Sequence, residues 1–261
     1  MPQPSKPLAG LQVIELGTLI AGPFAARICA EFGAQVTKVE SPDGGDPLRK
    51  WRKLYEGTSL WWFVQARNKR SITLNLKHPQ GREVLMKLLA EADILIENFR
   101  PGVLEKLGFG WDVLHALNPR LVMVRLSGFG QTGPMKDQPG FGAVGESMGG
   151  LRYITGFEDR PPVRTGISIG DSIAALWAVI GALMALRQRE VNGGQGQIVD
   201  VALYEAVFAM MASMVPEFDV FGFIRERSGN IMPGITPSSI HTCADGKHIQ
   251  IGANGDAIFQ R

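Results

Sequence analysis

The first half of the chain alternates short apolar runs with segments of helical periodicity. Residues 11–16 form an apolar run that ends at Gly17, and residues 22–32 follow with apolar side chains at helical spacing. Further predicted strands are 35–40, 71–76, 92–97 and 121–126, and further predicted helices are 79–91 and 101–107. Strands that alternate with helices predict βαβ units with right-handed crossovers. We therefore expect an α/β fold built on a Rossmann-like, doubly wound parallel sheet.

The second half has a different organisation. Residues 127–150 contain eight glycines and two prolines, which predicts a long loop or a set of short turns. A loop of that length inside a compact domain is usually functional. Asp171 is predicted to begin the strongest helix, which runs to about residue 190. Residues 197–201 and 247–253 are predicted as strands, and residues 203–215 as a helix.

The domain boundary is expected near residue 225, where a polar stretch with Gly and Pro begins. We expect residues 1–224 to form a large coenzyme-binding domain of the Rossmann type. Residues 225–261 would then be a linker and the beginning of a small domain. A helix is predicted to begin just before the chain ends at Arg261, so we expect that this small domain is truncated.

Charge and cysteine content limit the class of protein. The net charge is only +2, so neither nucleic acid nor a membrane surface is an expected partner. The apolar stretch 173–186 is shorter than a bilayer requires, which predicts a soluble protein. Two cysteines, Cys29 and Cys243, do not make a disulfide framework and favour the cytoplasm.

Common cofactor motifs are absent or incomplete. Gly17 and Gly22 follow the first predicted strand, but the middle glycine of GxGxxG is missing, which disfavours a nicotinamide cofactor although Glu40 lies at a suitable distance. No P-loop motif occurs. The neighbourhood of His241, Cys243 and His248 has no zinc spacing, so no metal is expected.

Asp171 is the residue that most suggests chemistry. One interpretation is a helix N-cap, for which Asp is a preferred residue. The other is a nucleophile, because a carboxylate at a helix N-terminus is stabilised as the anion and needs no general base. The residues alone leave both interpretations open. Basic residues near predicted strand ends suit a phosphorylated ligand; they are Arg67, Lys69, Arg70, Lys77, Arg100 and Lys106.

Many spaced motifs resemble one known family. The sequence is similar to the class III coenzyme A transferases, the family of formyl-CoA transferase, carnitine CoA-transferase and the bile-acid-inducible proteins. The resemblance covers nearly the whole chain in order. The matching segments are residues 7–16, 21–24, 32–40, 68–71, 75–77, 97–102, 118–121, 127–134, 170–171 and 194–201.

The resemblance implies a function in acyl-CoA metabolism. It implies a transferase that moves coenzyme A from an acyl-CoA donor to a small carboxylic acid, with Asp171 as the nucleophile that forms an aspartyl covalent intermediate. It also implies an interlocked homodimer, with acyl-CoA as substrate and no tightly bound cofactor. The residues that border coenzyme A by resemblance are Leu74, Lys77, Asn98, Phe99, Arg100 and Lys106.

Two departures and several alternatives remain. The formyl-CoA branch has a glutamine where this chain has Ile20, and a run of glycines that residues 228–234 lack, so oxalate and formate are not the expected acids. An α-methylacyl-CoA racemase is one alternative, but its histidine aligns with Phe141. A non-catalytic CoA-binding homologue is another. The donor and acceptor acids are left open.

Overall fold

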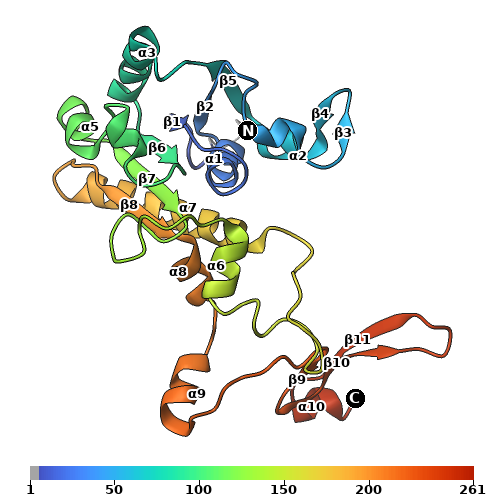
Figure 1. Cartoon of the computed structure of the whole chain (residues 1–261). Helices are drawn as coiled ribbons and strands as arrows, with labels where there is room; N and C mark the ends of the chain where they lie inside the picture. The colour runs from blue at the N-terminus through green and yellow to red at the C-terminus, as the bar shows by residue number, and fades with distance from the viewer. Residues whose placement is uncertain (1–5) are drawn as a thin grey trace, which may run out of the picture.

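A six-stranded parallel sheet forms the centre of the molecule (Figure 1). The computed structural model describes residues 6–261. Across the sheet the strands are β5 (Lys69–Thr73), β2 (Gln35–Glu40), β1 (Gln12–Glu15), β6 (Ile94–Glu97), β7 (Val122–Ser127) and β8 (Ile198–Ala202), and each neighbouring pair is parallel. Counted along the chain, this is the order 3-2-1-4-5-6 of a dinucleotide-binding sheet. The predicted α/β fold is confirmed.

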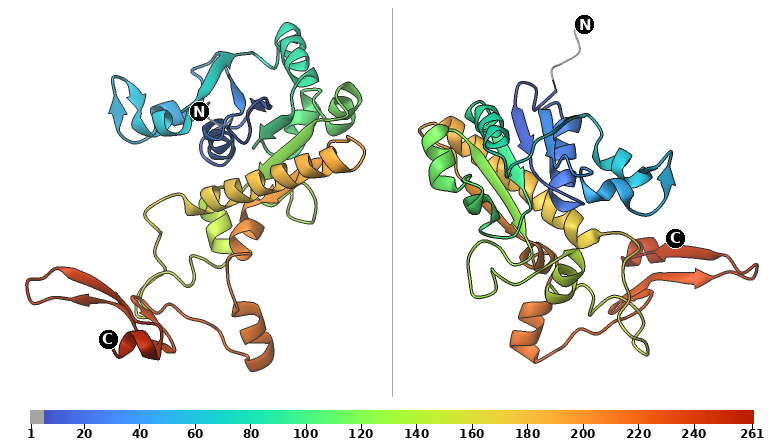
Figure 2. Two further views of the ribbon diagram at one scale, coloured as in Figure 1. Left: turned by 180° about the vertical axis from the view of Figure 1, so that it is seen from behind. Right: turned by 45° about the horizontal axis from the view of Figure 1, so that its top comes forward.

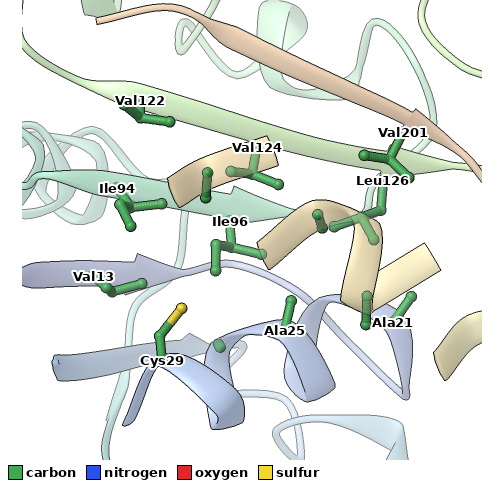
Figure 3. Close-up of a cluster of buried hydrophobic side chains, with 14 of the residues drawn as sticks. Val13, Ala21, Ala25, Cys29, Ile94, Ile96, Val122, Val124, Leu126 and Val201 are labelled. Carbon is green, nitrogen blue, oxygen red and sulfur yellow. The ribbon is translucent and has the colours of Figure 1, made fainter. Parts of the chain in front are cut away.

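Helices cover both faces of the sheet. On one face lie α1 (Ala21–Glu31) and α7 (Ile169–Val191), and on the other α3 (Pro79–Ala90), α4 (Val103–Lys106) and α5 (Trp111–Leu117). The first face is packed closely because α7 presents alanines at helical spacing; they are Ala174, Ala178, Ala182 and Ala185. Figure 3 shows Ala21, Ala25 and Cys29 of α1 against Val13 and Ile96 of the sheet. Small helix residues therefore bring the start of α7 close to the strand ends.

The glycine-rich segment 127–150 contains a helix that the sequence analysis missed. This helix, α6 (Gly142–Met148), packs against α7 and against α8 (Leu203–Phe208). Its glycines allow the close approach, because a Cβ at Gly145 would lie 2.9 Å from Leu203 Cβ. The prediction that the whole segment is a loop or a set of short turns is wrong for this reason.

Two further boundaries differ from the predictions. The helix expected over 203–215 is two helices, α8 and α9 (Met214–Phe221), separated near Ala212, whose φ of 49° is left-handed. The helix α7 is 23 residues long, so the expectation of a segment too short for a bilayer is also wrong. Within residues 6–261 it is the one helix whose length and apolar composition could span a membrane, and its buried face packs on the sheet.

Smaller elements extend from the central sheet. Between β2 and β5 the chain forms η1 (Pro47–Lys50), the hairpin β3 (Leu54–Tyr55) and β4 (Thr58–Ser59), and α2 (Leu60–Gln65). A separate antiparallel sheet contains β9 (Ile231–Met232), β10 (Ile235–Thr242) and β11 (His248–Gly252), followed by α10 (Asp256–Phe259). All three views place this second sheet apart from the first (Figures 1 and 2).

Candidate active site

The strand order places a crevice between the carboxyl ends of β1 and β6. The chain continues from β1 toward one edge of the sheet and from β6 toward the other edge, so the strand order reverses between them. This place is the topological switch point of the sheet, where ligands bind in open α/β folds. The loop after β1 and the loop after β6 are joined there. The amide of Thr18 donates to Asn98 Oδ1 at 2.7 Å, and Asn98 Nδ2 donates to the carbonyl of Thr18 at 2.9 Å.

Asp171 borders this crevice from the first turn of α7. It lines a cavity of about 140 Å³ together with the two joined loops, Phe141 and Arg100. It is not the N-cap, because the helix begins at Ile169 and Ser168 precedes it. The N-cap interpretation of Asp171 is therefore wrong. The first-turn position still stabilises the carboxylate anion through the helix dipole.

The surroundings of Asp171 disfavour its charged form. Burial, together with the nearby Glu146 carboxylate, raises the pKa of Asp171 to about 6, and Arg164 offsets part of this rise. Within residues 6–261 no hydrogen bond or ion pair reaches the Asp171 carboxylate. A carboxylate of this kind is mostly ionised at pH 7 but poorly stabilised, which suits a nucleophile.

Glu146 and Gly142 on α6 define the space around Asp171. The buried Glu146 accepts from the Gly170 amide at 3.2 Å and pairs with Arg152 at 2.7 Å, so it ties α6 to the start of α7. Gly142 lies directly against the Asp171 carboxylate, since a Cβ there would be 2.7 Å from Asp171 Cγ. Glycine at this position leaves room for the carboxylate to reach the crevice.

A buried charge network fixes the loop that follows β1. Lys38 lies 2.8 Å from Glu15 and 2.9 Å from Asp46, and Lys69 lies 2.7 Å from the other oxygen of Glu15. Asp46 also accepts from the amide of Leu19 at 3.0 Å, and Leu19 has a left-handed φ of 63°. Two lysines and two carboxylates balance in charge, so the network can hold this strained loop without a net buried charge.

A second ion-pair cluster supports the loop after β6. The buried Arg125 lies 2.7 Å from Glu97 and 2.7 Å from Glu105 of α4. Glu97 also accepts from the amide of Phe99 at 2.7 Å. Burial raises the pKa of Glu97 to about 6, although Arg125 opposes the rise. The cluster orients Asn98, Phe99 and Arg100 toward the crevice.

Five of the six residues predicted to border coenzyme A line two adjoining cavities. Leu74, Lys77 and Phe99 line a cavity of about 400 Å³ beyond β2. Asn98, Phe99 and Arg100 line the Asp171 cavity. Phe99 and Thr18 belong to both, so the two cavities adjoin. Lys106 is exposed on α4 and lines neither cavity; its role stays a prediction.

Four of the predicted basic residues lie in or near β5, and the structure gives them different surroundings; they are Arg67, Lys69, Arg70 and Lys77. Lys69 is buried against Glu15, and Arg67 pairs with Glu31 at 2.6 Å. Only Lys77 of these four residues lines the crevice cavities. The sequence alone does not reveal which basic side chains are buried or ion-paired. Fewer of these side chains than predicted are therefore available to bind phosphate. Residues that the sequence analysis did not single out are Gly142, Glu146 and Asp46, for which the sequence carried no motif.

Glu40 occupies a structural position and not that of a ribose-binding acid. Arg49 donates to both of its oxygens at 2.8 Å, and the amide of Asp46 donates at 2.7 Å. These donors outweigh burial, which acts in the opposite direction, and lower the pKa of Glu40 to about 2. With its oxygens occupied by the η1 segment, Glu40 has little capacity left for a nicotinamide nucleotide.

A parallel sheet with the strand order 3-2-1-4-5-6 and a crevice at the carboxyl ends of its central strands defines the class of doubly wound, Rossmann-like α/β proteins. Comparison with known proteins places the chain within one family. The profile of CoA-transferase family III matches residues 8–261. The chain belongs to this family.

Curated relatives agree with that assignment. The chain is 56% identical over 260 residues to the succinyl-CoA–D-citramalate CoA-transferase of Chloroflexus aurantiacus, covering 99% of this chain and 64% of that protein. It is 46% identical to the beta subunit of the succinyl-CoA–L-malate CoA-transferase of the same organism, covering 98% and 64%. The chain thus spans about 64% of the length of these two relatives.

A solved structure shows the same fold. A CAIB/BAIF family protein from Brucella suis superposes with a TM-score of 0.90 at 36% identity, covering 98% of this chain and 68% of that one. The crevice described above therefore lies in a fold that the family shares.

Proposed function

We propose that this protein transfers coenzyme A from an acyl-CoA to a carboxylic acid, with Asp171 as the covalent nucleophile. The observation that supports this most strongly is the position of Asp171. Its carboxylate faces the switch-point crevice without a donor among residues 6–261, next to a cavity large enough for a nucleotide. The carboxylate oxygens of a structural aspartate are expected to accept hydrogen bonds from backbone or cationic donors, as those of Asp46 do.

The proposed reaction begins at the thioester carbon. A carboxylate oxygen of Asp171 attacks this carbon, the C–S bond breaks, and the electron pair leaves with the CoA thiolate. The product is a mixed anhydride between Asp171 and the acyl group. The thiolate then attacks the Asp171 carbonyl carbon, which releases the first acid as its carboxylate and leaves an aspartyl-CoA thioester.

The second half of the reaction repeats these steps in reverse with the second acid. Its carboxylate attacks the aspartyl thioester and displaces the CoA thiolate, and the thiolate attacks the carbonyl carbon of the new acyl group. The second acyl-CoA leaves, and the carboxylate of Asp171 is restored. No proton is gained or lost, so the scheme requires no general base and no tightly bound cofactor. It also requires no metal.

Coenzyme A would lie along the two adjoining cavities. Leu74 and Phe99 offer apolar contacts for the adenine, and Lys77 offers a cation for phosphate. Asn98 and Arg100 border the passage to Asp171. Lys106 is exposed nearby on α4 and would contact the nucleotide only at the outer edge. The names of the two Chloroflexus relatives make succinyl-CoA the donor to test first.

An exchange experiment tests this function. Succinyl-CoA is incubated with the intact protein and each of a panel of unlabelled and isotope-labelled acids, and the label in the CoA thioester is followed. Transfer of CoA to at least one acid is expected, and free CoA should not accumulate. Hydrolysis alone, or binding without exchange in every combination, would contradict the proposal.

We propose further that two copies form a homodimer in the cytoplasm. The outer face of α7 carries large apolar side chains that are between 40 and 66% exposed; they are Leu176, Trp177, Ile180, Leu183 and Met184. Such a face on a single chain supports an interface. Both cysteines are free, which supports a reducing compartment. Sedimentation velocity over a hundredfold dilution should show a dimer, and a stable active monomer would refute the assembly.

We also propose that the chain divides at residue 225 into a large domain and the beginning of a small one. It is supported by the separate sheet β9–β11, which pairs with none of the six strands of the central sheet within residues 6–261. Limited proteolysis should cut between residues 222 and 230 before it cuts the central sheet.

A further inference from the structure

Phe141 is a large apolar side chain exposed to water at the mouth of the Asp171 cavity. It is 66% exposed, and it lines this cavity together with Asp171. Exposure alone decides nothing, because other phenylalanines are exposed as well, such as Phe32 and Phe157. Phe141 differs from them in its position, since its ring lies beside the proposed nucleophile.

The backbone on both sides of Phe141 is fixed. Gly140 lies against Gly128, since a Cβ at Gly140 would be 2.8 Å from Gly128 Cα. On the other side, Gly142 lies against the Asp171 carboxylate. The carbonyl of Phe141 accepts from two amides in the first turn of α6, at 2.8 and 3.1 Å. A fixed backbone leaves rotation of the side chain as the movement that is open to the ring.

The surroundings of Phe141 give its ring room and an apolar surface to pack on. Neither Gly140 nor Gly142 has a side chain, so Phe141 alone among residues 140–142 can cover the Asp171 carboxylate. The cavity includes a wall of buried apolar side chains; they are Ile20, Leu126 and Leu203. A phenyl ring that turns into the cavity would exchange water for contacts with this wall.

The proposed reaction has a specific need for such a cover. Its mixed anhydride reacts readily with water, and Asp171 itself is only partly buried. When a water oxygen attacks the anhydride, the C–O bond between the two acyl groups breaks and two carboxylates form. Of the two protons that water releases, the CoA thiolate takes one and solvent takes the other. The thioester is then lost as free acid and free CoA, and no CoA is transferred.

We propose that Phe141 turns over Asp171 once an acyl group is bound there and keeps water from the mixed anhydride. The proposal rests on the proposed function, because it assumes that Asp171 carries the acyl group. Phe141 takes part in no bond-forming step; its ring determines whether thiolate or water reaches the anhydride. The CoA thiolate is not excluded, since it is released inside the site. The two acids exchange later, while the less reactive thioester is on Asp171.

The partition between transfer and hydrolysis tests this role. The intact protein is incubated with succinyl-CoA and labelled succinate; transfer is measured as label that enters the thioester, and hydrolysis as free thiol. In Phe141→Ala the ratio of hydrolysis to transfer should rise at least about tenfold, which corresponds to about 1.4 kcal/mol between the two barriers. Phe141→Leu keeps a bulky apolar side chain, so its ratio should stay close to that of unmodified protein.

Phe32→Ala is the matched control. Phe32 is 53% exposed, but it lies at the opposite end of α1 and lines neither crevice cavity, so its removal should leave the ratio unchanged. A Phe141→Ala protein with the ratio of unmodified protein would overturn the proposal, even if both rates fall. So would a variant that only raises KM for succinyl-CoA, since the ring would then contact coenzyme A.

A measurement without turnover separates failure of this proposal from failure of the proposed function. A CoA thioether that carries the succinyl chain but cannot react is added, and Asp171 is modified with a water-soluble carbodiimide and quantified by peptide mass spectrometry. The thioether should protect Asp171 in unmodified protein and in Phe32→Ala, and much less in Phe141→Ala. This result would support the cover even if no acid is exchanged and the transferase assignment fails. Equal protection in all three proteins, or protection in none, would reject it.

Discussion

Two carboxylates that border the same crevice, Glu40 and Asp171, are held in opposite ways. Glu40 accepts hydrogen bonds from Arg49, Ser71 and the amide of Asp46, and these outweigh burial and lower its pKa to about 2. Asp171 has no such donor within residues 6–261, and burial and the charge of Glu146 raise its pKa to about 6. The carboxylate with donors fixes a loop of the crevice, whereas the one without donors is the proposed nucleophile.

The same contrast predicts opposite effects on stability. A carboxylate whose pKa is lowered on folding stabilises the folded state above its unfolded pKa, and this stability is lost as the pH falls toward 2. A carboxylate whose pKa is raised destabilises the folded state once it ionises, from about pH 4 to about pH 6. Asp171, the proposed nucleophile, is thus expected to lower the stability of the folded state at neutral pH, and Glu40 is expected to raise it.

Replacing the proposed nucleophile should have the largest effect. Asp171→Asn removes the attacking oxygen while keeping the side-chain shape, so CoA exchange should fall by at least about 1,000-fold. The free energy of unfolding at pH 7 should stay the same or rise, because the cost of ionising Asp171 disappears. Exchange assays and urea unfolding at pH 7 measure the two effects. Exchange within about tenfold of unmodified protein would contradict the nucleophile.

The same substitution at a paired carboxylate should act on stability. Asp46→Asn leaves Lys38 and Lys69 with only Glu15, so the buried network gains a net positive charge. The free energy of unfolding should fall by about 3 kcal/mol.

Urea unfolding of this variant checks the prediction, with Asp43→Asn as the control. Asp43 is exposed on the same loop and should change stability by less than about 0.5 kcal/mol. Equal stability of the two variants would remove the distinction between paired and unpaired carboxylates on which the comparison rests.

Filling the space beside Asp171 tests its freedom of movement. The Cβ of Gly142→Ala would overlap the Asp171 carboxylate, so kcat should fall by about 100-fold while the fold is kept. Gly166 offers a control, because a Cβ at that position meets nothing within 4 Å. A Gly142→Ala protein as active as Gly166→Ala would show that the carboxylate reacts from another position.

The smallest expected effect is a shift in the pH dependence of CoA exchange. Exchange should rise with pH as Asp171 ionises, with a midpoint near pH 6. Glu146→Gln removes a like charge and should move this midpoint to lower pH, whereas Arg164→Gln should move it higher. At pH 7 about 90% of Asp171 is already ionised, so the rate of Glu146→Gln there should change little. Shifts of the same sign in both variants would exclude Asp171 as the titrating group.

Much of the fold was predictable because hydrophobic periodicity is local information. The residues of β2 match the predicted strand, and α3 differs from its prediction by one residue. Helix α6 was not predictable in this way. Its glycines usually indicate loop, and here they form a helix because they let α6 approach α7 and α8. Tertiary packing decided this element.

The site was predictable only where motifs marked it. Asp171 was identified through a family resemblance, since the residues alone allowed an N-cap that the structure rejects. Lys69 was predicted among ligand-binding cations, but it is buried against Glu15, which lies more than 50 residues earlier in the chain. Contacts of this range depend on strand order, and a single sequence does not reveal which charges become partners.

Trapping the covalent intermediate tests the central claim most directly. The intact protein is mixed with succinyl-CoA and then with hydroxylamine, which attacks anhydrides and thioesters of carboxylates. Peptide mass spectrometry should find a hydroxamate on Asp171, dependent on acyl-CoA and absent from Asp171→Asn. Continued CoA exchange with an unmodified Asp171 peptide, or a hydroxamate on a different carboxylate, would contradict the account.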